Sequence, residues 1–255
     1  MEFTQEVESK NGKSWITALI IGLCIVISSA LLAWGVTNMR KTEHSITATG
    51  SASVDFDSNL ITWGGSFMVH AATTTSAYNQ ISKDAEIVKK YLLDNGINES
   101  DMAFSSIDIT RRSKDIYDDN GNYIGSEPDG YDLQQTVSIQ SSDVFTVEAI
   151  SRDISSILQS GVEFTSDSPE YYYTDLDSLK LDLIDKASKN AMDRINIIAA
   201  NSNAKLGKLK NSSLGVFQIT ARNSGTSDYS YDGAFNTSSY AKTATITVRL
   251  EYDLN

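Results

Sequence analysis

The hydrophobic and polar residues form three kinds of pattern along the chain, and each pattern predicts a different kind of element. Residues 15–34, WITALIIGLCIVISSALLAW, form a run of twenty without a charge. From about Ser45 onward there are segments in which every second residue is apolar, as half-buried strands require. Between them, apolar residues recur at steps of three and four, the period of an amphipathic helix. The pattern therefore predicts one apolar helix followed by a domain of helices and strands.

Strands are predicted where every second residue is apolar. The first two have inward-facing residues Ile46, Ala48, Gly50, Ala52 and Val54, and then Ile61, Trp63, Gly65, Phe67 and Val69. Further strands are predicted near 103–112, 131–140 and 162–164. Two final strands are predicted near 213–221 and 242–252, separated by a polar loop, 222–240, of unusual length for a compact domain.

Helices are predicted where the apolar period changes to three and four. Residues 75–95 form the first, and Gly96 is placed to end it in a left-handed cap. A second helix around 147–157 is stopped by Gly161. The third and longest spans roughly 175–204 and has a single buried stripe.

The order of these elements predicts the fold class. From residue 58 to 166 it is strand–helix–strand–strand–helix–strand, the split βαβ arrangement of ferredoxin-like sheets. We therefore expect an α+β fold with mixed or antiparallel sheets, a long helix and a C-terminal β-hairpin, preceded by one transmembrane helix. The expected organisation is an N-terminal tail (1–14), a membrane anchor (15–36), a linker (37–44) and one domain (45–255).

The apolar run has the length that a helix needs to cross a bilayer, and a tryptophan at each end suits the membrane interface. A cleaved signal peptide is the alternative, with Ser28-Ser29-Ala30 as its cleavage site, but apolar residues continue beyond that site. A lipoprotein would use Cys24, yet Leu23 stands where a small residue is expected. An uncleaved anchor is favoured. Two basic residues flank the run on each side, so charge alone does not orient it.

The charge balance and the cysteine content exclude some classes of function. The net charge is −12, from 21 Lys and Arg against 33 Asp and Glu, and such a surface repels nucleic-acid backbones. We therefore predict no nucleic-acid partner. A single cysteine rules out an intrachain disulfide and a cysteine-based metal site.

One acidic segment, DIYDDNGNYIGSEPDGY, comes close to an EF-hand calcium loop. With Gly121 at loop position 6, the calcium candidates are Asp118, Asn120 and Glu127, but position 1 is then Ile116, which has no ligand oxygen. An EF-hand also needs a helix on each side, whereas this segment joins two predicted strands. We therefore interpret it as a hairpin tip built from turn-forming residues, and we predict neither a metal nor a cofactor.

Catalytic motifs are mostly missing from the sequence. His70 is the only credible general base for a Ser-His-Asp arrangement, and a histidine at a strand end is more often structural. No phosphate-binding glycine loop is present, since the two glycines of WGGSF lie within a predicted strand. Paired carboxylates for glycoside chemistry have no positive signal. We predict that the protein is not an enzyme.

Aromatic residues in two loops suggest contacts with partners, because tyrosines are enriched at protein interfaces. The first set is Tyr171, Tyr172 and Tyr173, which come between a strand and the long helix. For this set the alternative is one tyrosine in the core and two half-exposed. The second set is Tyr229, Tyr231 and Phe235, in the loop before the last strand.

Several passages together resemble the SIMPL family, a domain of unknown function. They are, in order, ITATGSASV, YLLDNGINESDMAFSSIDI, DGYDLQQTVSI, SGVEFTSDSPE and NAKLGKL. The sequence departs from the family in having Ala52 in place of a second glycine, and Phe56-Asp57 in place of a Pro-Asp turn. The resemblance implies an exported protein, because bacterial members are tied to envelope stress and some form large ring- or channel-like oligomers. A eukaryotic branch acts as a signalling adaptor.

Our leading hypothesis is a single-pass protein of the bacterial inner membrane with its domain on the extracytoplasmic, periplasmic side. It would be held in the lipid bilayer by Trp15 to Trp34 and would act as a self-associating structural or interaction module of the cell envelope. Its expected partners are further copies, forming a homo-oligomer, and other envelope proteins, in a role related to stress. The alternatives are a monomeric ligand- or calcium-binding envelope module that uses loops 115–130 and 222–240, and an unrecognised hydrolase that uses His70.

Overall fold

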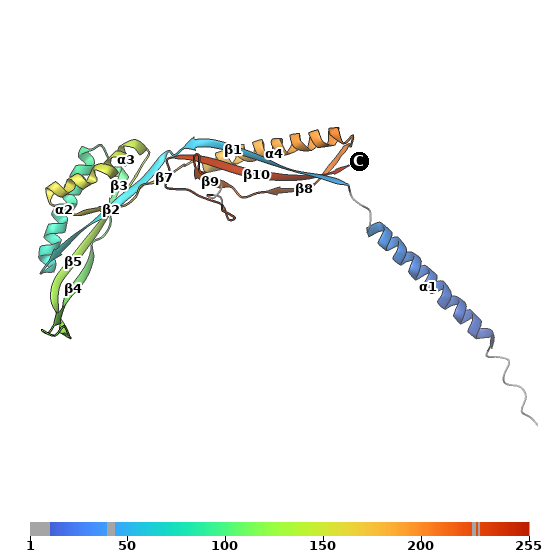
Figure 1. Ribbon diagram of the computed structural model, residues 1–255, viewed down its shortest axis with the longest axis horizontal. Coiled ribbons are helices and arrows are strands. Elements are labelled where there is room, and N and C mark those ends of the chain that lie inside the picture. The colour runs from blue at the N-terminus through green and yellow to red at the C-terminus, as the bar shows by residue number, and fades with distance from the viewer. Residues whose placement is uncertain (1–10, 40–43, 226–227, 229, 255) are drawn as a thin grey trace, which may run out of the picture.

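The computed structural model describes residues 11–39, 44–225, 228 and 230–254, with side chains described from residue 15 and not for 37–39. Figure 1 shows three parts that follow one another: an N-terminal helix, a sheet covered by one long helix, and a second sheet covered by two shorter helices. The predicted tail up to residue 10 and residues 40–43 of the predicted linker lie outside the described residues.

The first helix, α1 (Asn11–Met39), contains the apolar run. Within it, Trp15–Val36 is long and apolar enough to cross a membrane, and none of this segment is buried against the rest of the protein. At 1.5 Å per residue these 22 residues span about 33 Å, close to the thickness of a bilayer's hydrocarbon core. The length and composition of the predicted apolar helix are therefore confirmed.

The first sheet has the last strand of the chain at its centre. Strand β10 (Ala241–Leu254) pairs antiparallel with β1 (Ser45–Asp57) on one side, and with β8 (Leu206–Leu214) and β9 (Gln218–Ala221) on the other. Helix α4 (Leu176–Asn201) covers one face. Its buried stripe packs against the inward residues of β1 and β10, in a cluster that includes Leu183, Ala187, Ala191, Ile195, Ala244, Ile246 and Val248.

The second sheet has the strand order β3-β5-β2-β6, with all neighbours antiparallel. Its central strands are β2 (Leu60–Ala71) and β5 (Tyr123–Ser141), and its edges are β3 (Met102–Phe104) and β4 (Asp108–Tyr117) on one side and β6 (Phe164–Ser166) and β7 (Glu170–Tyr172) on the other. This order is the split βαβ arrangement, which confirms the predicted fold class.

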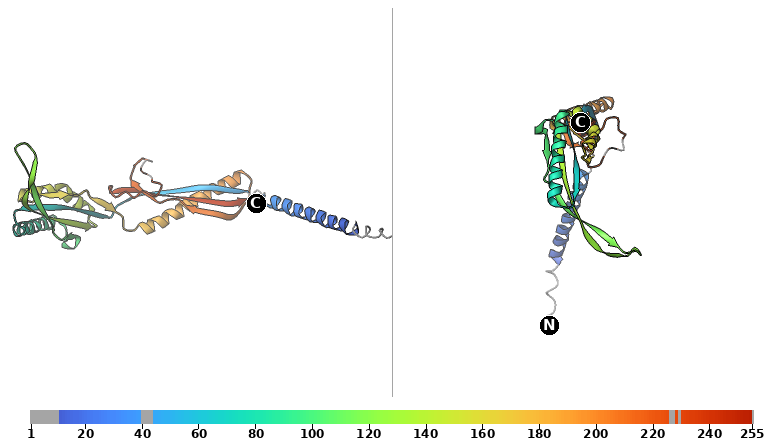
Figure 2. Two further views of the ribbon diagram at one scale, coloured as in Figure 1. Left: turned by 90° about the horizontal axis from the view of Figure 1, so that it is seen from below. Right: turned by 90° about the vertical axis from the view of Figure 1, so that its left-hand side faces the viewer.

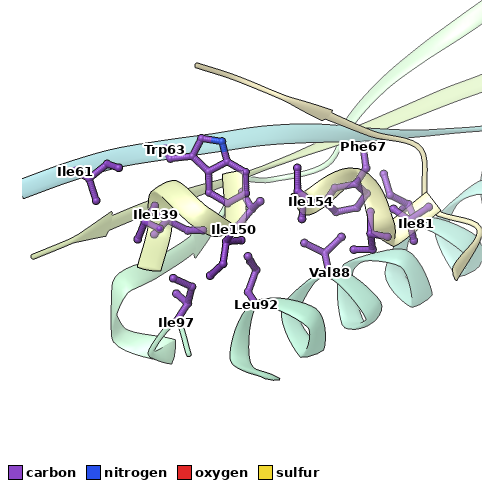
Figure 3. Packing of buried hydrophobic residues seen from close by; sticks show 14 of the residues in the cluster. Ile61, Trp63, Phe67, Ile81, Val88, Leu92, Ile97, Ile139, Ile150 and Ile154 are labelled. Carbon is purple, nitrogen blue, oxygen red and sulfur yellow. The ribbon is translucent and has the colours of Figure 1, made fainter. Parts of the chain in front are cut away.

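Two helices cover one face of this second sheet. They are α2 (Thr74–Asp94) and α3 (Val144–Asp153), the latter continued by a 3₁₀ turn over Ile154–Ser160; another such turn spans Glu99–Asp101. Gly96 and Gly161 follow the helical segments with φ angles of 98° and 84°, as predicted for left-handed caps. Figure 3 shows side chains of both helices meeting Trp63 and Phe67 of β2 in a core separate from that of the first sheet.

The structure refines two predicted strands. The strand expected near 213–221 covers only the end of β8 and all of β9, and most of β8 lies before it; residues 215–217 between them are not in a strand, and the Gly215 N–H donates to the Thr247 carbonyl at 2.8 Å. The strand expected near 103–112 is likewise divided into β3 and β4. Between them the Ser105 hydroxyl accepts the Thr136 N–H and interrupts the regular ladder.

Candidate interaction site

The hairpin of β4 and β5 projects from the second sheet as an arm, at the end of the molecule opposite α1 (Figures 1 and 2). Strand β5 pairs with β2 only as far as Tyr131, which stands opposite Ala71. Beyond that point β4 and β5 pair with each other alone, up to Tyr117 opposite Tyr123. We call residues 111–130 the arm. No helix covers this ribbon, so both of its faces are open to solvent.

The tip of the arm is a tight turn organised by Asp118. The Asp118 N–H donates to the Asn122 carbonyl, and the Gly121 N–H donates to the Asp118 carbonyl, each at 2.9 Å. Gly121 has a φ of 82°. The Asp118 carboxylate accepts the N–H groups of Asn120 and Asn122 at 2.9 and 2.8 Å. These bonds, chiefly those from Asn122, lower the pKa of the Asp118 carboxyl. Asp118 therefore serves the turn, as hairpin chemistry predicts.

The arm separates the three calcium candidates. Asp118 and Asn120 lie together in the turn, whereas Glu127 stands opposite Lys114, part way down the ribbon. Within the described residues, no group of three or more His, Cys, Asp or Glu side chains is placed to hold a metal ion. The geometry gives no support to a calcium site at the arm.

The arm carries exposed apolar and aromatic side chains that the sequence analysis did not single out. The rings of Tyr117 and Tyr123 meet edge to face across the ribbon at 6.0 Å, and each residue is more than half exposed. Ile124 beside them is 63% exposed. The available signal was the symmetric placing of two tyrosines around the DDNGN turn, which cross-strand pairing brings face to face.

Asp132 holds the base of the arm to the sheet. Its carboxylate lies 2.7 Å from Nδ1 of His70 on β2 and 3.2 Å from Nε of Arg112 on β4. Three strands are thereby tied at one point. A carboxylate on Nδ1 is also a feature of hydrolase triads, but no serine or cysteine of the described chain hydrogen-bonds to His70. The arrangement supports a positioning role for His70.

The three consecutive tyrosines lie in different environments. Tyr171 is only 7% exposed and packs edge to face on Tyr240, and burial, followed by the nearby Glu148 carboxylate, raises the pKa of its hydroxyl. Tyr172 donates to Glu170 at 2.7 Å, while Tyr173 packs on Phe56 at 5.0 Å. One tyrosine thus lies in the core and two are half-buried where the two sheets join.

The described residues of the long loop, 222–225, 228 and 230–240, include several that are bonded near the same junction. The buried amide of Gln218 donates to the Ser230 carbonyl and accepts the Ala234 N–H, each at 2.6 Å. Tyr231 is 95% exposed and Phe235 is 54% exposed. Tyr229, the remaining interaction candidate of this loop, lies outside the described residues.

A polar groove runs along the face of the second sheet that the helices leave open. Its volume is about 740 Å³, and its lining includes Thr62, Gly64, Thr136, Ser138, Asp167 and Glu170. It lies away from the arm tip, and it borders Tyr172, which stands opposite the lining residue Leu60 and donates to Glu170.

Residues 46–252 match the sequence model of SIMPL, described as a protein of unknown function (DUF541). The matched segment begins in β1 and ends in β10, so it contains both sheets and the arm. No curated protein matches the chain.

Proposed function

The chain belongs to the SIMPL family, and on this premise we propose that it is a membrane-anchored, extracytoplasmic module of the cell envelope that associates with further copies of itself through the arm. It acts by contact and not by catalysis. The bilayer helix α1 holds the copies in one plane, which raises their effective concentration, so that weak contacts suffice.

The single observation that carries this proposal is the uncovered arm. A two-stranded ribbon on its own is only marginally stable in water, and unpaired strand edges favour pairing with another chain. The arm adds a pair of exposed tyrosines and an exposed isoleucine at its end. Such residues supply most of the binding energy in interfaces, and within this chain they bury little area.

The charge distribution supports a second copy as the partner. The base of the arm carries Arg111, which has no ion-pair partner among the described residues, and Arg112, which is paired with Asp132; Asp129 lies near them, and the tip carries Asp118 and Asp119. Two arms that align antiparallel therefore place each acidic tip beside the other copy's Arg111. A two-fold contact of this kind is self-complementary in charge.

Support for the location comes from two sources. The length and composition of Trp15–Val36 support a single membrane crossing. The exported character of the bacterial proteins that this chain resembles supports the extracytoplasmic side and a role in envelope stress.

The test is sedimentation velocity of the full chain in detergent over a range of concentrations. We expect a concentration-dependent species larger than the monomer. The double variant Tyr117→Ser/Tyr123→Ser should weaken association by about tenfold or more, since truncated aromatic contacts at interfaces each cost on the order of 1–2 kcal/mol.

The matched control is Tyr231→Ser, which removes a more exposed tyrosine from the 222–240 loop and should leave association unchanged. A monomer at every concentration contradicts self-association altogether. Association that survives the double variant but is lost in Tyr231→Ser moves the interface from the arm to the loop.

The open-face groove favours one other function, a monomeric module that binds a polar ligand. Its lining of hydroxyl, amide and carboxylate groups suits a neutral, hydrogen-bonding molecule. Ser138→Trp, which fills the groove from β5, should leave self-association intact and abolish ligand protection of the chain against heat. If a candidate ligand protects the unaltered chain and the Ser138→Trp variant equally against heat, the ligand does not bind in the groove.

A further inference from the structure

We propose that the end of the first sheet nearest α1 docks on anionic phospholipid headgroups and so fixes the angle at which the domain stands on the bilayer. This inference rests on the proposed anchoring of α1 in a membrane. The docking surface, which we call the rim, consists of Ile197, Ile198, Lys205, Lys208 and Leu209, at the end of α4 and the start of β8.

The rim is close to the membrane because the connection is short. Five peptide steps separate Met39, the last residue of α1, from His44, so they span at most about 17 Å. The His44 carbonyl accepts the Leu254 N–H at 2.8 Å, and Leu254 stands opposite Leu206 of β8. Strands lie about 4.8 Å apart, which places the start of β8 about 10 Å from His44 across the sheet. Figure 1 shows α4 and β8 reaching this same end.

The rim differs in charge from the rest of the protein. The net charge of the chain is −12, yet residues 194–214, from the end of α4 to the end of β8, contain four Lys and Arg and no Asp or Glu. Lys205 and Lys208 are exposed, and within the described residues neither has an ion-pair partner. Two such lysines are available for lipid phosphates, which a basic cluster beside a membrane helix attracts.

One acidic side chain at this end of the first sheet, Glu251, already has partners. The Glu251 carboxylate accepts the Ser45 hydroxyl at 2.8 Å and lies 3.9 Å from Lys210. Asp253 lies against Gly207, on the neighbouring strand. Its carboxylate repels anionic headgroups, and the two rim lysines outnumber it.

Apolar side chains accompany the lysines. Ile197 is 61% exposed, Leu209 51% and Ile198 45%, although they belong to a helix and a strand whose other faces are packed. A basic surface with exposed isoleucine and leucine is the composition of elements that lie in the membrane interface. The lysines meet the headgroups while the apolar side chains enter the boundary with the acyl chains.

The test uses the full chain with Cys24→Ser and Ser212→Cys, reconstituted in vesicles and labelled at residue 212 with a membrane-impermeant donor dye. Energy transfer to an acceptor lipid is compared between pure phosphatidylcholine and vesicles with about a third phosphatidylglycerol. We expect at least twofold more transfer with the anionic lipid, and 0.5 M NaCl should remove the gain because salt screens surface charges.

The variant Lys205→Gln/Lys208→Gln should lose at least half of that gain. Its matched control is Lys83→Gln/Lys90→Gln, which removes the same charge from α2 in the second sheet's layer and should keep the gain in full. Equal transfer with the two lipids, or equal losses in the two variants, overturns the docking proposal.

Anchoring is measured on the same vesicles by flotation after a carbonate wash. A chain that floats but shows no lipid dependence contradicts the docking alone. A chain that the wash releases contradicts the anchor, and the docking proposal with it.

Discussion

Lys242 is a buried cation in the first sheet. It occupies the second position of β10 on the face that packs against α4, is only 2% exposed, and donates from Nζ to the Asn236 carbonyl of the 222–240 loop. Burial lowers the pKa of its ammonium group from the ordinary 10.5 to about 8. A charge in this position opposes folding at neutral pH.

The free energy of unfolding depends on pH because the folded and unfolded states release the Lys242 proton at different pH values. The unfolded chain keeps the Lys242 proton up to about pH 10.5, whereas the folded chain releases it near pH 8. Between these values the unfolded state binds more protons, so the free energy of unfolding rises with pH. Below pH 8 both states are protonated, and the full cost of burying the charge remains.

We therefore predict that Lys242→Met raises the free energy of unfolding at pH 7 by about 2 kcal/mol. The pKa shift corresponds to about 3 kcal/mol, from which the lost hydrogen bond to Asn236 subtracts about 1 kcal/mol. Denaturant unfolding of both proteins at pH 7 and pH 10 measures the difference, which should shrink or change sign at the higher pH. A difference that is independent of pH shows that Lys242 does not titrate in this range.

At the scale of elements, the contact between α4 and β1 depends on Gly50. A Cβ atom there would lie 2.2 Å from the Ala187 carbonyl oxygen and 2.3 Å from the Ala191 nitrogen, both in the backbone of α4. The helix can rest directly on the strand only because residue 50 has no side chain.

Gly50→Ala should lower the free energy of unfolding by about 1–3 kcal/mol, because α4 must move away from the sheet. The control is Ser51→Ala, on the opposite, exposed face of β1, which should change it by less than about 0.5 kcal/mol. Denaturant titration of the two variants measures both changes in the free energy of unfolding. Equal stabilities would show that α4 is not seated on this strand.

Periodicity predicted the elements whose buried residues come from one face. Ile81, Val88 and Leu92 recur at helical steps in α2 and are fully buried, so their spacing was sufficient evidence. It could not predict the length of β5, because the segment from Tyr123 to Gly130 contains Gly125, Pro128 and Gly130, which usually mark turns. That segment is a strand because β4 pairs with it, and its burial pattern has no alternation to read.

The candidate site was predictable only in part for a related reason. Tyr171, Tyr172 and Tyr173 are three consecutive residues of one type, and their different burial is set by distant residues such as Tyr240 and Phe56. The turn residues of the arm, by contrast, act through local backbone chemistry. The role of Asp118 and Gly121 could therefore be read from the sequence, whereas the tyrosine pair beside them needed the cross-strand register.

At the scale of the whole molecule, two separate cores are joined at a short junction. Only Ser58 and Asn59 separate β1 from β2, and each is bonded to a distant segment. The Ser58 N–H donates to the Tyr240 carbonyl, and the Asn59 N–H donates to the Tyr172 carbonyl, each at 3.0 Å. The Asn59 side chain also exchanges two hydrogen bonds of 2.9 Å with Thr174. These bonds connect the sheet that α4 covers to the sheet that carries the arm.

Because the junction is bonded on several sides, we predict that both cores unfold in one cooperative transition. Asn59→Ala removes the two side-chain bonds to Thr174, each worth about 1 kcal/mol, and should let the sheets unfold separately. Calorimetry of the full chain in detergent tests this through the ratio of the van't Hoff to the calorimetric enthalpy, which should fall clearly below one in the variant. Asn79→Ala, an exposed change on α2, is the control. Two transitions in the unaltered chain would mean that the two sheets unfold independently in spite of the bonds at the junction.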